Sequence, residues 1–202
     1  MISKKQTKKP QKKKQNLIYS LMNKSQQITL SKTLSYWLRH KPEKIGLVLE
    51  KDGWVDVSEL IEKAKSEIYI TLDDLKQVVE ENDKQRFSFN EDYTKIKANQ
   101  GHTAEVDIKF TKIVPPVVLY HGTVDKFLAS IKKQGLTKQK RHHVHLSKDK
   151  EVAINVGSRR GKPVVLEIDC KAMLSDGYDF FVSDNGVYLT DSVPSKYIKV
   201  LQ

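Results

Sequence analysis

The first half of the chain places its apolar residues at a helical period. Leu30, Leu34 and Leu38 fall about one turn apart, which predicts a helix over residues 31–40. Two further helix starts follow at Asp56 and Thr71, each marked by a capping residue with an acidic residue three positions later. This segment is therefore expected to fold as three helices.

The period then changes to alternation, which is typical of strands. Residues 86–89 and 95–98 alternate polar and apolar positions on either side of a polar turn, so they predict a β-hairpin. Three helices followed by a hairpin is the element order of a winged-helix domain. That fold is used against nucleic acid and also for protein contacts, so the fold alone does not decide the function.

The second half alternates short strands with short helices. Strands are predicted at residues 117–121, 143–146, 163–169, 180–183, 187–190 and 197–201, and helices at residues 126–134 and 150–156. Gly135 and Gly157 are expected to end these two helices. The expected organisation is a tail at residues 1–27, a first domain at 28–103, a linker at 104–116 and a second domain at 117–202.

Charge changes this picture at the N-terminus. The net charge of the 202-residue chain is +11, and residues 1–24 contribute eight lysines and no acidic residue, which leaves +3 for the remainder. The tail has too few apolar residues to bury a core and is expected to be disordered. It is an electrostatic arm for nucleic-acid phosphates, an address such as a nuclear signal, or a solubilising extension, and the sequence leaves these alternatives open.

The rest of the composition fits an intracellular protein, cytoplasmic or nuclear. No apolar run approaches the roughly 20 residues of a membrane span, and no signal-peptide core follows the basic start, so no membrane partner is expected. Cys170 is the single cysteine, which excludes an intramolecular disulfide. Because it lies in an apolar run, it is expected to be a small buried residue.

Candidate chemistry lies in two segments about a hundred residues apart, Leu38–Pro42 and Tyr120–Ser147. Arginine offers a fixed fork of N–H donors and histidine an exchangeable proton, which together suit a phosphate group. No glycine-rich phosphate loop of either common spacing is present. His143 and His145 would share one face of a strand, but no third zinc ligand is identifiable, so no metal is expected. Taken singly, each polar residue also has an ordinary structural explanation.

These segments belong to a longer series of motifs in a fixed order. The series comprises Leu30–His40, Asp52–Val55, Asn82–Phe87, Ala98–Thr103, Tyr120–Thr123, His143–Ser147, Gly161–Leu166 and Asn185–Leu189. It resembles the RNA 2′-phosphotransferases, the KptA family also called tRNA 2′-phosphotransferase, from about Leu30 to the C-terminus. Two departures are Thr103, where Ser is common, and Tyr188, where Trp is often found.

The resemblance implies an α+β protein, with an N-terminal winged-helix-like domain followed by a C-terminal domain of the ADP-ribosyltransferase fold. That fold binds NAD+ without a Rossmann fingerprint. The catalytic residues implied by the resemblance are Arg39, His40, Arg86 and Arg141. The NAD+-binding residues implied by it are His121, Gly122, Thr123, His145, Ser147 and Val187.

The activity implied by the resemblance is removal of an internal 2′-phosphate from RNA, as found at a tRNA splice junction, by transfer to NAD+. The implied route forms an ADP-ribosylated 2′-phospho-RNA and releases nicotinamide. Transesterification then gives 2′-OH RNA and ADP-ribose 1″,2″-cyclic phosphate, so NAD+ is consumed. Two alternatives stay open. One is an ADP-ribosyltransferase acting on nucleic-acid terminal phosphates or protein; the other is a non-catalytic winged-helix nucleic-acid-binding protein.

Overall fold

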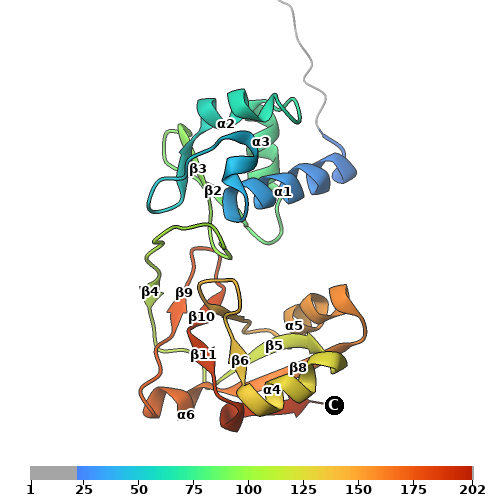
Figure 1. Ribbon diagram of the computed structural model, residues 1–202, viewed down its shortest axis with the longest axis vertical. Coiled ribbons are helices and arrows are strands. Elements are labelled where there is room, and N and C mark those ends of the chain that lie inside the picture. The colour runs from blue at the N-terminus through green and yellow to red at the C-terminus, as the bar shows by residue number, and fades with distance from the viewer. Residues whose placement is uncertain (1–21, 202) are drawn as a thin grey trace, which may run out of the picture.

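Helices and short strands alternate along residues 22–201, the part of the chain that the computed structural model describes. They form two lobes, one above the other in Figure 1. The mixed content confirms the predicted α+β class. Residues 1–21, which hold most of the expected tail, lie outside the described residues. Between residues 22 and 201, no helix combines the length and apolar character that crossing a membrane requires.

The N-terminal lobe contains the predicted helices and hairpin. Its elements are α1 (Lys24–Arg39), β1 (Trp54–Asp56), α2 (Val57–Ala64), α3 (Leu72–Glu80), β2 (Phe87–Phe89) and β3 (Lys95–Ala98), with a 3-10 helix at Pro42–Ile45. The three strands form an antiparallel sheet in the order β1-β3-β2. Strand β1 was not predicted, because it pairs with β3 about forty residues further along the chain and no hairpin turn links the two.

Helix α1 begins earlier than the sequence predicts. Asn23 caps it, accepting a hydrogen bond from the Gln26 N–H, while the Gln26 side chain accepts one from the Asn23 N–H. Residues 24–27 therefore belong to α1, and the predicted tail boundary at residue 27 is wrong. A capping box uses polar residues, so the apolar period gave no sign that the helix begins at Lys24. The predicted caps at Asp56 and Thr71 are confirmed.

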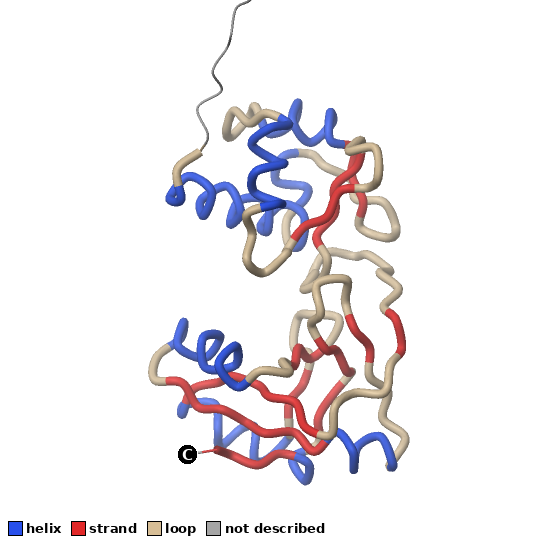
Figure 2. Tube along the Cα trace, turned by 180° about the vertical axis from the view of Figure 1, so that it is seen from behind, coloured by secondary structure: helices blue, strands red, loops and turns tan. Residues whose placement is uncertain are grey.

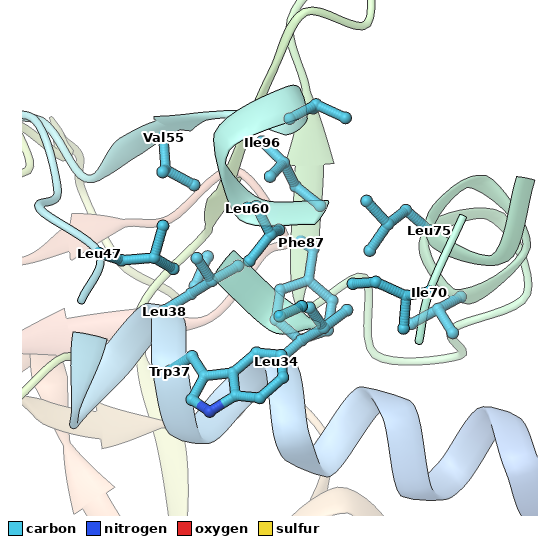
Figure 3. Close-up of a cluster of buried hydrophobic side chains, with 14 of the residues drawn as sticks. Leu34, Trp37, Leu38, Leu47, Val55, Leu60, Ile70, Leu75, Phe87 and Ile96 are labelled. Atoms are coloured by element: carbon cyan, nitrogen blue, oxygen red, sulfur yellow. The ribbon is translucent and has the colours of Figure 1, made fainter. Parts of the chain in front are cut away.

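The apolar faces of these helices and the sheet meet in one core, shown in Figure 3. Leu34 and Leu38 are 0 % exposed and Trp37 is 2 % exposed, which confirms the apolar stripe expected on this helix. Phe87 enters the same core from β2. Burial of these side chains fixes the end of α1 and the start of β2, from which the neighbouring arginines emerge.

The C-terminal lobe is built mainly from short antiparallel strands. Its strands are β4 (Thr111–Lys112), β5 (Val118–Val124), β6 (Leu136–Thr137), β7 (Val144–Leu146), β8 (Pro163–Asp169), β9 (Phe181–Val182), β10 (Tyr188–Thr190), β11 (Ser192–Val193) and β12 (Ile198–Leu201). Its helices are α4 (Leu128–Gln134), α5 (Lys150–Gly157) and α6 (Cys170–Ser175), with 3-10 helices at Asp125–Phe127, Ser158–Arg160 and Ser195–Tyr197. The strands pair in the orders β4-β9-β10-β7, β11-β6 and β12-β8-β5. Figure 2 shows the long pair β5 and β8 crossing this lobe, on the side of the molecule where α1 and α5 also lie.

Two predictions for this lobe need correction. Helix α5 ends at Gly157 as expected, but not through a left-handed glycine cap; Gly157 has helical dihedral angles, and the chain continues through the 3-10 helix to Gly161. The expected linker at residues 104–116 contains strand β4, which pairs with β9 and extends its sheet. Both differences concern residues whose role depends on a distant segment of the chain, β5 for Gly157 and β9 for strand β4. Cys170 is buried as expected, and burial raises the pKa of its thiol to about 12.

Candidate functional site

Three predicted arginines lie at element ends that face the junction of the lobes. Arg39 is the last residue of α1, Arg86 precedes β2, and Arg141 lies in the loop before β7. Arg39 Nη2 donates a hydrogen bond to the backbone carbonyl of Arg86 at 3.1 Å. The Arg39 guanidinium carbon also lies 5.8 Å from the centre of the Phe87 ring. These contacts tie the end of α1 to the start of β2.

The three arginines form a positively charged cluster. Burial, together with the charges of Arg86 and Arg141, lowers the pKa of Arg39 to about 10. Burial and the charge of Arg159 lower the pKa of Arg86, while Asp83 acts in the opposite direction. Burial, with neighbouring arginines, also lowers the pKa of Arg141. A bound anion would relieve this mutual repulsion, so the cluster is suited to hold a phosphate.

His40 adds a titratable group beside this cluster. Its Nδ1 lies 3.0 Å from Thr103 Oγ1. The backbone N–H groups of Thr103 and Ala104 donate to the Arg39 carbonyl at 2.8 and 2.9 Å, so the chain closes over the end of α1. Burial and the charges of Arg39 and Arg141 lower the pKa of His40. A neutral imidazole therefore stands next to fixed positive charges.

Two histidines of the C-terminal lobe have defined tautomers. Arg141 Nη1 lies 2.6 Å from His145 Nδ1, and because a guanidinium only donates, His145 accepts there and carries its proton on Nε2. His121 Nδ1 lies 3.0 Å from the His145 carbonyl, which only accepts, so the proton of His121 is on Nδ1. Burial, with the charges of Arg141 and Arg39, lowers the pKa of His145 to about 3. Burial also lowers the pKa of His121.

Gly101 lies where the two lobes approach each other. Its φ is +88°, and a Cβ at this position would lie 3.7 Å from Arg39 Nη1 and 3.8 Å from His145 Cε1. The neighbouring His102 is 2 % exposed, and its Nε2 has no hydrogen-bond partner among residues 22–201. Burial lowers the pKa of His102 to about 3. The side chains of Arg39, from one lobe, and His145, from the other, therefore both lie next to the backbone of Gly101.

The turn before β10 gives a second contact between the lobes. Asn185 Nδ2 donates to the Lys84 carbonyl at 2.9 Å, and Asp184 pairs with Lys97 at 2.9 Å. Val187 ends this turn, where its N–H donates to Ser183 Oγ at 3.2 Å. The turn thus touches the N-terminal lobe just before Arg86 and places Val187 beside the start of β10.

The remaining predicted residues lie on β5 and at the end of β7. Ser147 exchanges two backbone hydrogen bonds of 2.8 Å with Tyr120, next to His121. Gly122 lies against α5, because a Cβ there would fall 1.8 Å from the Ala153 carbonyl oxygen. Thr123 is 7 % exposed. His121 and Ser147 are therefore neighbours, whereas Gly122 and Thr123 have evident packing roles.

Several residues of this region had no predicted role. Asn82 Oδ1 accepts hydrogen bonds of 3.1 Å from Arg86 Nη1 and from the Lys84 N–H, while Asn82 Nδ2 donates to Ser31 Oγ at 3.0 Å. Asn82 belongs to one of the motifs named above, which was the available signal. Arg160 follows α5, and its charge helps to lower the pKa of Arg141 and of His121. An arginine in a polar segment gave no comparable signal.

The histidine cluster considered for zinc has other contacts. The His143 ring lies 5.5 Å from the Phe110 ring and 5.9 Å from the Phe181 ring, centre to centre. Over the part of the chain that the structure describes, no group of three or more His, Cys, Asp or Glu side chains is arranged to hold a metal ion.

Comparison with known proteins shows the family. The model of a family described as "RNA 2'-phosphotransferase, Tpt1 / KptA family" matches residues 25–192. The chain belongs to this family. A protein of Burkholderia pseudomallei named probable RNA 2'-phosphotransferase is 58% identical over 170 residues, covering 84% of this chain and 92% of the relative. Proteins of the same name from Trichormus variabilis and Flavobacterium johnsoniae are 52% and 54% identical, covering 89% and 88% of this chain and 100% and 98% of the relatives.

Proposed function

We propose that this chain is an RNA 2′-phosphotransferase that moves an internal 2′-phosphate of RNA to NAD+. The observation that carries the proposal is the cluster of Arg39, Arg86 and Arg141, drawn from both lobes in a chain of this family. The products would be RNA with a 2′-hydroxyl, nicotinamide and ADP-ribose 1″,2″-cyclic phosphate. A tRNA splice junction is the expected source of such a phosphate.

The architecture is consistent with a winged-helix-like domain followed by an ADP-ribosyltransferase-like domain. In the N-terminal lobe, a helix, a strand, two helices and a hairpin follow one another, and β3 is the central strand of the sheet. In the C-terminal lobe, antiparallel β5 and β8 pair along their whole length beneath α5. The division of the arginines between these lobes would require both for binding of the phosphate.

The arginines would hold the 2′-phosphate and set its line of attack. Arg39 offers a guanidinium whose orientation is fixed by the Arg86 carbonyl, and Arg86 is fixed in turn by Asn82. Fixed donors cost little reorganisation when charge develops on the phosphorus oxygens, so they stabilise the transition state more than the ground state. Arg141 would complete the set from the C-terminal lobe.

His40 is the candidate for proton transfer. Its lowered pKa leaves the imidazole neutral near neutral pH, and the adjacent arginines would hold the phosphate within reach. Departure of the RNA 2′-oxygen requires a proton, which a protonated His40 would donate. Contact with a bound dianionic phosphate would favour the protonated imidazole, because an opposite charge raises the pKa of a histidine.

The residues of the C-terminal lobe fit NAD+. When bound, NAD+ supplies the ribosyl carbon that accepts the phosphate and a leaving nicotinamide. His121 and His145 are neutral with fixed tautomers, so they offer directed hydrogen bonds without repelling the cationic nicotinamide ring. Arg159 and Arg160 provide nearby charge for a pyrophosphate. Ser147, beside His121, would contact the adjoining ribose.

The proposal is tested by coupling nicotinamide release to loss of the RNA phosphate. The purified protein is mixed with NAD+ and an RNA that carries one internal 2′-phosphate, with the same RNA lacking that phosphate as the control. We expect one nicotinamide for each 2′-hydroxyl formed, and none with the control RNA. Nicotinamide release with a stable ADP-ribosylated RNA or protein would favour the ADP-ribosyltransferase alternative. RNA binding without any nicotinamide would favour the non-catalytic alternative.

A further inference from the structure

A stripe of side chains runs along α1 from the predicted phosphate site. Lys24, Ile28, Lys32, Tyr36 and His40 follow one another at four-residue steps. Successive residues at this spacing are neighbours on the helix surface, about 6 Å apart along the axis and about 40° apart around it, so the five form a row that winds slowly along the helix. All five line one hollow of about 490 Å³ in the N-terminal lobe. The stripe therefore extends for about 24 Å and ends at a residue of the phosphate site.

The stripe has no packing explanation. Lys24 and Lys32 are exposed, Ile28 is 47 % exposed and Tyr36 is 45 % exposed, although other residues of α1 form the core. Figure 1 places α1 at the edge of its lobe nearest the C-terminal lobe. Two exposed lysines that alternate with an exposed aliphatic chain and an exposed ring form a surface that is available to a partner.

The opposite wall of the hollow carries charges of both signs. Lys84 and Arg86 lie there with Asp83 and Glu81. The Glu81 carboxylate is engaged, because its two oxygens accept hydrogen bonds of 2.7 and 3.1 Å from the side chains of Gln27 and Gln77. The charges of Lys84 and Arg86 are thus balanced by Asp83 and Glu81, and the net positive charge of the hollow comes from Lys24 and Lys32 on the α1 face.

Single-stranded RNA is the partner that this surface fits. Proteins bind single strands by combining a cationic path for the phosphates with aromatic rings on which bases stack. Here the lysines alternate with an apolar side chain and an aromatic one, and the path is continuous with His40 and Arg86. We propose that the nucleotides on one side of the 2′-phosphate run along this stripe, with a base on Tyr36 and backbone phosphates on Lys32 and Lys24. The inference rests on the proposed function, since it takes the 2′-phosphate to lie at Arg86 and His40.

Three RNAs test the inference. Each carries the same 2′-phosphate, the first with the shortest flanks that react, and the others with four further nucleotides on the 5′ side or on the 3′ side. We expect one of the two extensions to raise kcat/KM, and Tyr36→Ala to reduce that gain about tenfold, in line with the loss of one base stack. Lys32→Gln should reduce the gain and lower the salt slope of binding by about 0.7. Tyr69→Ala is the matched control, because Tyr69 is 81 % exposed in the same lobe and lies outside the hollow.

Two results would contradict the proposal that RNA runs along the stripe. One is a wild-type protein that gains nothing from either extension; the other is a gain that survives in both stripe variants. If the wild-type protein releases no nicotinamide with any of these RNAs, the proposed function has failed. In that case, fluorescence anisotropy measures the affinity for the extended RNAs and tests RNA binding by the stripe without any need for activity. Equal affinity for wild type, Tyr36→Ala and Lys32→Gln would exclude it, and weaker binding by both variants would support it as an RNA surface.

Discussion

Arg39 Nη2 donates a hydrogen bond to the backbone carbonyl of Arg86, which also accepts one from the Asn99 N–H. The guanidinium of one predicted phosphate ligand is thus positioned by the main chain of another. Because the Asn99 side chain in turn accepts from Ser88 and donates to the Gln85 carbonyl, the start of β2 is held from several directions. Changes at Arg39 should therefore affect chemistry more than they affect folding of the loop.

Substitution of Arg39 should separate charge from geometry. Arg39→Ala is expected to lower kcat/KM on the order of 100-fold or more, as for loss of one fixed donor to a transition state. Arg39→Lys keeps the charge but loses the fork of N–H groups, so we expect it to recover only part of the activity. Steady-state kinetics measures both, and gel analysis would reveal ADP-ribosylated RNA if the second step slows more than the first. Full activity of Arg39→Ala would remove Arg39 from the mechanism.

Asn82 is expected to act through Arg86 and not on the RNA. Asn82→Ala removes the acceptor of the Arg86 Nη1 hydrogen bond, which is worth about 1 kcal/mol, so kcat/KM should fall about fivefold to tenfold. Asn82→Asp keeps an oxygen at that position and should restore much of the rate. A purely structural role would instead lower the melting temperature of both variants alike and leave kcat/KM of the folded protein unchanged.

The sequence predicted the parts of this protein that depend on local pattern. The caps at Asp56 and Thr71 and strand β8 are set by neighbouring residues, and each was found where expected. Gly157 does end α5, but the reason for a glycine there was missed, because it lets α5 approach β5, a contact between distant segments. The motifs drew attention to Arg39 and Arg86, but the link through the Arg86 carbonyl and Asn82 depends on side-chain placement, which spacing along the chain does not encode.

His102 should make the protein sensitive to acid. Its pKa is lowered by burial to about 3 in the folded protein, whereas an unfolded histidine takes up a proton near pH 6.5. The unfolded state therefore binds more protons between these values, and stability is lost as the pH falls from about 6.5 towards 3. In urea titrations, His102→Gln should show a shallower loss of unfolding free energy, by up to about 1.4 kcal/mol per pH unit. An unchanged slope would contradict the buried neutral state.

Gly122 should be intolerant of a side chain. The Cβ of Gly122→Ala would meet the Ala153 carbonyl oxygen at 1.8 Å, so α5 would have to move away from β5. We expect a loss of about 3 kcal/mol or more in unfolding free energy. Gly177→Ala is the control, because its Cβ would meet no described atom within 4 Å and its cost, about 1 to 2 kcal/mol, comes from its φ of +85° alone. Equal losses for the two variants would show that the close approach is not limiting.

The fate of the phosphate tests the central claim most directly. The 2′-phosphate of the RNA is labelled with ³²P, the protein is added with and without NAD+, and the labelled products are separated. Transfer between the substrates predicts that the label appears in ADP-ribose 1″,2″-cyclic phosphate, that it does so only when NAD+ is present, and that Arg39→Ala or Arg141→Ala slows its appearance. Label released as inorganic phosphate, or product formed without NAD+, would contradict the account.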